Sequence, residues 1–169
     1  MRTSSSSIST PASTPSASAL ARLSLFWFGI QALWGALLGI SVQARVAQVA
    51  GTHALVFYGY VATAGAFVAA CTQLVVGPLS DRRRRGGSRR VEFYGAGTVI
   101  GTAALLWFYA APTAALLIAA YATLQIGLNV AIGPYQAAIP DTVGSGSSGR
   151  ASAWMAAFQS AGNAAGAVL

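Results

Sequence analysis

A short basic segment, residues 77–90 (GPLSDRRRRGGSRR), lies between two long apolar runs, and it constrains the fold more than any other feature of this chain. It contains six of the ten arginines and one of the three acidic residues. Basic clusters between membrane-length apolar segments lie on the cytoplasmic side of a bilayer. The segment therefore predicts a multi-pass membrane protein, and it predicts the orientation of the segments on either side.

Long stretches without a charged residue supply the predicted membrane spans. Residues 23–44 and 54–79 are each long enough to cross a hydrocarbon core of about 30 Å at about 1.5 Å per residue. The stretch 93–140 is about twice a single span, and Pro112 divides it near its middle. The fold class is therefore an all-α membrane protein. Five transmembrane helices are predicted, at about 23–44, 54–79, 93–111, 113–134 and 151–169.

The segment before the first apolar run, residues 1–19, is dominated by Ser, Thr, Ala and Pro. Such a composition predicts a disordered tail, because it buries too little apolar surface to offset the entropy of ordering. Residues 20–169 then form the helical bundle. Five crossings put the tail and the loop at 141–150 on the same side as the arginine segment. We expect a multi-pass protein of the plasma (inner) membrane, embedded in the lipid bilayer, with a cytoplasmic N-terminus.

Composition also bears on which function classes fit. Charged residues make up 8% of the chain, against about 25% in soluble domains. The net charge of +7 comes from arginines that topology explains, so no nucleic-acid partner is predicted. Cys71 is the single cysteine and His53 the single histidine, and no carboxylate lies within a predicted span. We therefore predict no catalytic residues, no enzymatic activity, no metal site and no cofactor.

Glycines at GxxxG spacing recur in three of the predicted helices. This spacing lets helix backbones approach closely in lipid, where packing rather than hydrophobic burial drives association. It predicts close helix contacts within a compact bundle. The pairs are Gly35 with Gly39, Gly97 with Gly101, and Gly162 with Gly166.

Uncharged polar and aromatic residues repeat at helical spacing within the apolar runs. These candidate cavity residues are Gln31 and Trp34 on the first predicted helix, Tyr121, Gln125 and Asn129 on the fourth, and Gln159 and Asn163 on the fifth. Amides facing lipid would lack hydrogen-bond partners, so these faces point into the bundle or into a watery cavity. Two interpretations remain open. The residues form interhelical hydrogen bonds, or they line a cavity for a neutral polyhydroxylated or mixed polar–apolar small molecule.

The arginine segment resembles the signature loop that joins the second and third helices in the major facilitator superfamily. The pattern is a glycine, three residues, Asp-Arg, a short basic or glycine-containing stretch and a closing Arg-Arg, carried here by Gly77, Asp81, Arg82, Arg89 and Arg90. The resemblance implies a twelve-helix secondary transporter that works by alternating access between two halves. This chain then forms the N-terminal part, its partner is the missing C-terminal half, and we expect residues 1–169 alone not to transport.

Residues 133–141 (GPYQAAIPD) resemble the segment that closes the fourth helix in glycoside–cation symporters of the sucrose-transporter type, a group with arginine where Gln136 stands. The resemblance implies secondary active transport of a small polar solute, such as a sugar or glycoside. The resemblance of the arginine segment to the superfamily loop further implies that the loop arginines pair with Asp141 in a cytoplasmic latch that stabilises the outward-facing state. Two alternatives remain open: efflux of amphipathic compounds, and a membrane scaffold or assembly subunit without transport.

Overall fold

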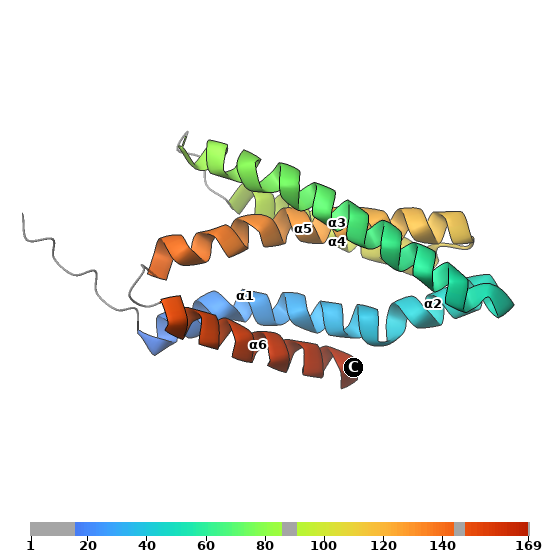
Figure 1. Ribbon diagram of the computed structural model, residues 1–169, viewed down its shortest axis with the longest axis horizontal. Coiled ribbons are helices and arrows are strands. Elements are labelled where there is room, and N and C mark those ends of the chain that lie inside the picture. The colour runs from blue at the N-terminus through green and yellow to red at the C-terminus, as the bar shows by residue number, and fades with distance from the viewer. Residues whose placement is uncertain (1–15, 86–90, 144–147, 169) are drawn as a thin grey trace, which may run out of the picture.

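The computed structural model describes residues 16–85, 91–143 and 148–168, and it describes their side chains except at positions 23, 84–85 and 137–143. Almost all of these residues are helical (Figure 1). The elements in chain order are α1 (Ala17–Ala36), the π-helical turn η1 (Leu37–Ser41), α2 (Val42–Ala50), the 3₁₀ turn η2 (Gly51–His53), α3 (Ala54–Arg85), α4 (Val91–Ala110), α5 (Ala114–Val143) and α6 (Ser148–Val168).

The first helix begins earlier than the composition of the tail predicts. The Ser16 hydroxyl oxygen accepts a hydrogen bond from the Ala19 backbone N–H at 3.2 Å. This is an N-cap, which satisfies one of the backbone donors that a helix start leaves without a partner. Helix α1 therefore starts at Ala17, so residues 17–19 of the predicted tail are helical.

The first helical arm is also longer at its far end than the predicted helix 23–44. It continues from α1 through η1 into α2 and reaches Ala50. Gly51 then adopts φ of +53°, a left-handed conformation that glycine tolerates without a steric penalty. The chain reverses at this glycine, and α3 runs back antiparallel to α1 and α2 (Figure 1).

Helix α3 extends beyond the predicted end at residue 79. It includes Pro78 and continues to Arg85, so the first nine residues of the basic segment 77–90 are helical rather than loop. Arginine is a good helix former, which favours this extension. Residues 86–90 lie outside the described part of the chain.

The remaining helices differ from the predicted bounds mainly at their ends. Helix α4 ends at Ala110 and α5 starts at Ala114, with Pro112 and Thr113 in the turn between them. The Thr113 hydroxyl oxygen accepts from the Leu116 backbone N–H at 3.4 Å and so caps α5. Helix α5 continues to Val143, beyond the predicted end at 134, and α6 starts at Ser148 rather than at 151.

Three helical stretches of the described residues are long and apolar enough to cross a membrane: 17–83, 91–110 and 114–136. The first of these contains the reversal at Gly51, so it consists of two antiparallel arms. The chain is therefore a multi-pass, all-α membrane protein by length and composition. The fifth crossing, by α6, remains a prediction.

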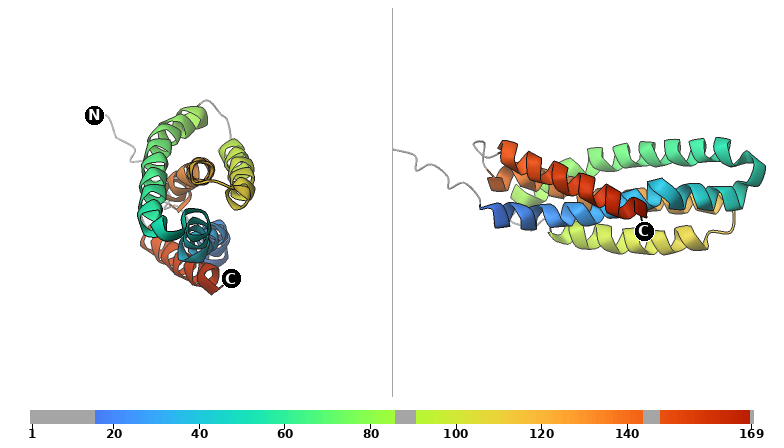
Figure 2. Two further views of the ribbon diagram at one scale, coloured as in Figure 1. Left: turned by 90° about the vertical axis from the view of Figure 1, so that its right-hand side faces the viewer. Right: turned by 90° about the horizontal axis from the view of Figure 1, so that it is seen from below.

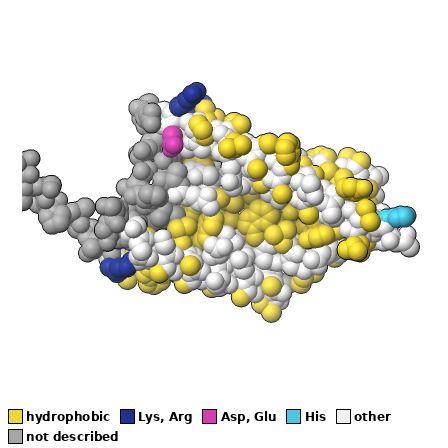
Figure 3. Space-filling view, viewed as in Figure 1, with side chains coloured by type: hydrophobic (Ala, Val, Ile, Leu, Met, Phe, Trp, Pro, Cys, Tyr) yellow, Lys and Arg dark blue, Asp and Glu magenta, His cyan; other side chains and the backbone are white. Residues whose placement is uncertain are grey.

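The helices form two groups that lie side by side (Figure 1). Helix α6 packs along α1, while α3 and α4 both pack along α5. The end-on view in Figure 2 places α5 between α3 and α4. On the face drawn in Figure 3, charged side chains gather at one end of the bundle and the histidine lies at the other, with apolar side chains between them.

Two of the predicted glycine pairs lie at close helix contacts. A Cβ atom added to Gly97 in α4 would lie 2.6 Å from the carbonyl oxygen of Gly127 in α5. One added to Gly162 in α6 would lie 2.6 Å from the carbonyl oxygen of Phe28 in α1. No side chain fits at either distance, so the absence of a Cβ permits these contacts.

In the third glycine pair, only one of the two glycines lies at a helix contact. A Cβ added to Gly35 would collide with the backbone of Asn163, whereas one added to Gly39 would have no atom within 4 Å. Of this pair, Gly35 therefore serves the contact between α1 and α6. Gly39 lies in the π-helical turn instead.

An arginine connects the two helical groups through a hydrogen bond. Arg45 in α2 donates from Nη2 to the carbonyl oxygen of Ala111 at 2.8 Å, directly after the last residue of α4. The last carbonyls of a helix lack intrahelical partners and attract cations. Arg45 thus supplies α4 with a charged partner from the other helical group.

Candidate functional site

A pocket of about 530 Å³ lies where α1, α3 and α5 face one another. Its lining residues share a lack of charge: all are amide, aromatic or aliphatic. They are Trp27, Gln31, Trp34 and Leu38 from α1 and η1, Ala62, Ala66, Ala69 and Gln73 from α3, and Tyr121, Gln125, Asn129, Ile132 and Gln136 from α5. A pocket of this size, largely apolar with a few convergent polar groups, is typical of small-molecule sites.

Five of the seven candidate cavity residues line this pocket. Gln31 and Trp34 come from one side, and Tyr121, Gln125 and Asn129 come from α5 on the other. The i, i+4 spacing along α5 puts its three residues on one face, as the sequence predicts. The structure thus brings together residues that lie about 90 positions apart in the sequence.

The two candidates on α6 do not line the pocket. The Gln159 side-chain oxygen accepts a hydrogen bond at 3.3 Å from Nε1 of Trp27, which is itself a lining residue. The Asn163 backbone lies against Gly35 at the contact between α1 and α6. Gln159 therefore reaches the site through Trp27, and Asn163 belongs to helix packing.

Three amide side chains form a hydrogen-bonded chain across the pocket. Gln73 donates from Nε2 to Oδ1 of Asn129 at 2.7 Å. Asn129 donates from Nδ2 to the backbone oxygen of Gln125 at 2.8 Å and to its side-chain oxygen at 3.3 Å. Gln73 and Asn129 thus bond between α3 and α5, and all three amides also line the pocket. That this pocket holds a small molecule stays a prediction.

Sequence patterns did not single out Gln73, although one signal was present: it is the only amide in the apolar run 54–79. Gly65 was missed as well. A Cβ at Gly65 would collide with the Tyr121 ring and lie 3.2 Å from Nε2 of Gln125. The missing side chain at Gly65 therefore makes room for Tyr121 and Gln125 on the polar face of α5.

Aromatic residues join α1 to α5 at one end of the pocket. The rings of Trp27 and Tyr135 stack with centroids 5.7 Å apart and planes 13° apart. Phe26 contacts Tyr135 at a centroid distance of 5.0 Å. Gln136, next along α5, lines the pocket beside this cluster. The pocket is thus bounded at this end by ring contacts between its two main walls.

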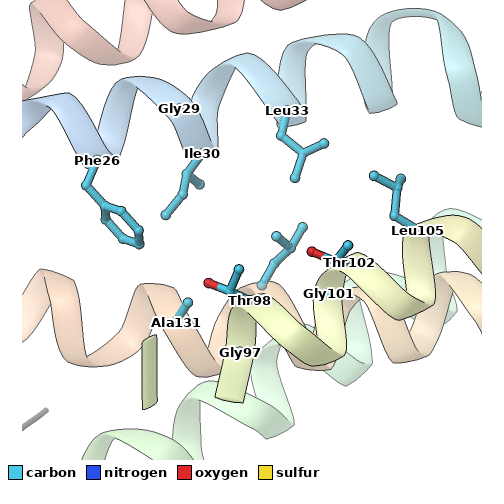
Figure 4. Close-up of a pocket in the computed structure, with 11 residues that line it drawn as sticks. Phe26, Gly29, Ile30, Leu33, Gly97, Thr98, Gly101, Thr102, Leu105 and Ala131 are labelled. Carbon is cyan, nitrogen blue, oxygen red and sulfur yellow. The ribbon is translucent and has the colours of Figure 1, made fainter. Parts of the chain in front are cut away.

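A second, smaller hollow of about 270 Å³ lies between α1 and α4 (Figure 4). Phe26, Ile30 and Leu33 face Thr98 and Thr102 across it. The two threonines are its only polar side chains, and the Thr98 hydroxyl already donates to the Tyr94 carbonyl at 2.7 Å. This hollow suits apolar groups and offers little to a hydrogen-bonding solute.

The predicted latch is described only in part. Asp81 and Arg82 are exposed in the last turns of α3, and a Cβ at Gly77 would have no atom within 4 Å. Gly77 therefore does not lie at a close helix contact among the described residues. Arg89, Arg90 and the side chain of Asp141 lie outside the described residues. The latch stays a prediction.

One ion pair at this end is described. Arg83 donates from Nη1 to Oε2 of Glu92 in the first turn of α4 at 2.9 Å. Both side chains are more than half exposed, so the pair contributes at most about 1 kcal/mol. Within the described ranges no group of three His, Cys, Asp or Glu side chains is placed to hold a metal ion.

A comparison with protein families matches residues 3–167 to the Major Facilitator Superfamily. No curated protein matches the chain. No solved structure matches it either.

Proposed function

The chain belongs to the Major Facilitator Superfamily, whose members are secondary transporters, and we propose that it forms part of a transporter for a small uncharged solute rich in hydroxyl groups, such as a sugar or glycoside. The single observation that carries this proposal is the chemistry of the pocket between α1, α3 and α5. Its lining combines amides and aromatic rings with no charged side chain. Amides exchange hydrogen bonds with hydroxyl groups, and aromatic faces pack against the apolar faces of a sugar ring.

The absence of charge in the lining favours a neutral solute over an ion. An anion or cation in a pocket of low dielectric needs a charged partner to offset its lost hydration. None of the lining residues supplies one. A neutral polyol needs only hydrogen-bond donors and acceptors, which Gln31, Gln73 and Gln136 provide.

For the mechanism we propose alternating access. The three lining helices supply one wall of the binding site, and a second helical bundle, the C-terminal half, supplies the other wall. Rocking of the two bundles then exposes the solute to each side of the membrane in turn. The proposal includes five crossings by residues 20–169, a cytoplasmic N-terminus and a plasma-membrane location.

The test is uptake into proteoliposomes of the protein together with its partner bundle. Radiolabelled sucrose and methyl β-D-glucopyranoside are supplied outside, with and without an inward proton or sodium gradient. We expect uptake of at least one glycoside above that of empty vesicles, and loss of this uptake in Gln125→Leu. Equal uptake by empty vesicles for every glycoside tested would reject the proposal.

A second candidate is efflux of amphipathic compounds. It is favoured by two tryptophans in the pocket lining, Trp27 and Trp34, and by the apolar hollow between α1 and α4. The same vesicles loaded with a fluorescent cationic dye distinguish the two candidates, since only an efflux pump extrudes the dye. A protein that moves neither probe but co-purifies with a stable partner would instead be a scaffold or assembly subunit.

A further inference from the structure

We propose that Gln73 is the residue that recognises a hydroxyl group of the transported solute, and that Asn129 is a positioning residue that orients the Gln73 amide. The proposal rests on the proposed function and adds to it a specific recognition group. Its basis is the hydrogen-bonded chain from Gln73 through Asn129 to Gln125.

The polarity of this chain is determined by one backbone atom. The Gln125 carbonyl oxygen can only accept a hydrogen bond, so the Asn129 group 2.8 Å from it must be the NH₂. The Asn129 carbonyl oxygen then lies on the opposite side of the carboxamide. It meets Gln73 at 2.7 Å, and Gln73 must therefore donate. A carboxamide that could otherwise adopt either orientation thus has only one at Gln73.

The three amides differ in exposure and in the hydrogen-bonding groups that remain available to a solute. Asn129 is 3% exposed, and its side-chain nitrogen donates to the backbone oxygen and to the side-chain oxygen of Gln125. Gln125 is 5% exposed and accepts two of these bonds. Gln73 is exposed on the pocket wall, and among the described residues its side-chain oxygen and second N–H have no hydrogen-bond partner. Gln73 is therefore the accessible end of a chain whose inner members are buried.

An amide held in this way matches a hydroxyl group. Its oxygen accepts from the solute O–H, and its second N–H is available to donate to a hydroxyl oxygen. Because Asn129 fixes the orientation in advance, binding requires no reorientation of the amide at Gln73. A solute hydroxyl also extends an existing chain of hydrogen bonds, which strengthens each bond through polarisation.

The experiment measures binding of methyl β-D-glucopyranoside and its four monodeoxy analogues to the protein with its partner bundle in nanodiscs. In the wild-type protein we expect removal of one hydroxyl to weaken binding by about 10-fold. In Gln73→Leu, removal of the same hydroxyl should change binding less than about 2-fold, because the partner of that hydroxyl is already absent. Asn129→Leu should lose the same discrimination, and the double variant should bind no more weakly than Gln73→Leu.

Thr72→Val is the matched control. The neighbouring Thr72 hydroxyl is bonded to the Val68 carbonyl at 2.7 Å, and Thr72 does not line the pocket.

A second variant separates recognition from folding. In Gln73→Glu an ionised carboxylate cannot donate to Asn129, whereas a protonated carboxyl group can donate and still keep an acceptor oxygen. Binding by this variant should therefore be weak at pH 8 and recover as the pH falls through the pKa of the new carboxyl group. The lining contains no other carboxyl, imidazole, amino or guanidinium group, so the wild-type protein lacks this response. Thermal unfolding is measured at both pH values, because a purely structural role for Gln73 predicts that stability and binding recover together, whereas recognition predicts recovered binding at unchanged stability.

The outcomes are distinct. If the wild-type protein binds glucosides and Gln73→Leu discriminates the deoxy analogues as the wild type does, the assignment of Gln73 is overturned and the proposed function stands. If Gln73→Glu binds equally at both pH values, the positioning role of Asn129 is overturned. If the wild-type protein neither binds nor transports any glucoside, the proposed function fails and this inference fails with it.

Discussion

Trp27 and Tyr135 stack with nearly parallel rings whose centroids lie 5.7 Å apart, and this contact links α1 to α5 across more than a hundred residues of sequence. The same indole donates from Nε1 to Gln159 in α6 at 3.3 Å. Trp27 is 6% exposed, so both contacts lie largely inside the bundle. One side chain therefore connects three helices at the end of the pocket.

The two contacts of Trp27 can be separated by substitution. Trp27→Phe keeps a ring against Tyr135 but removes the indole N–H, whereas Trp27→Leu removes both contacts. We expect Trp27→Phe and Gln159→Leu each to lower stability by about 0.6 kcal/mol, the average for hydrogen bonds between membrane helices. Trp27→Leu should lose about 0.5–1.5 kcal/mol more, the value of an aromatic pair. Unfolding in mixed detergent micelles measures these differences, and equal losses for Phe and Leu at this position would contradict the role of the stack.

The glycine pair in the first helical arm predicts opposite effects at two positions four residues apart. Gly35→Ala places a Cβ against the Asn163 backbone and should destabilise by about 1–3 kcal/mol. Gly39→Ala meets no atom within 4 Å and should be neutral or stabilising by up to about 1 kcal/mol. Thermal unfolding of both variants in the same detergent tests this difference. A loss at Gly39 as large as that at Gly35 would show that the contact with α6 is not the cause.

Neighbouring residues on α3 should differ in their access to water. Gln73 lines the pocket, whereas Leu74 is 75% exposed but does not line it, so we expect it to face lipid. After Cys71→Ser, a cysteine at Gln73 should react with a membrane-impermeant thiol reagent, and a cysteine at Leu74 should not. A solute that occupies the pocket should slow the first reaction. Cysteines at Tyr121, Gln125 and Asn129 extend the test. If none of the four cysteines reacts, the polar residues of α5 have only a structural role.

The latch predicts that one exposed acid matters for transport and not for assembly. In the complete transporter, Asp81→Asn should reduce uptake at least about 10-fold while expression and topology stay normal, because arginines rather than acids set orientation. Glu92→Gln is the control, since it removes only the exposed pair with Arg83. We expect it to cost at most about 1 kcal/mol of stability. Normal uptake by Asp81→Asn at normal expression would contradict the latch.

The sequence alone was sufficient to predict the all-α membrane class and the polar face of α5. Both follow from short-range rules: charged residues are excluded from spans, and residues four apart share a helix face. The same rules identified five of the pocket-lining residues, because an amide within an apolar run is costly unless it has a partner. These features depend on what one helix does in lipid, so one segment at a time is enough to predict them.

Helix ends and helix partners could not be predicted in this way. The extension of α3 to Arg85 and the early start of α1 depend on local caps and helix propensities that the charge pattern does not show. Gly35 and Gly39 have the same spacing as the other glycine pairs, and only the position of α6 separates their roles.

The partner of Asn129 was decided by the tertiary structure. Gln73 lies 56 residues away, and no spacing relates the two. Their bond forms because α3 packs closely on α5 at Gly65, where the lack of a side chain leaves room for Tyr121 and Gln125. A sequence pattern indicates which residues need a hydrogen-bond partner. Which partner each residue meets depends on the distance between two packed helices and on their relative position along the helix axis. Side chains distant in the sequence determine both.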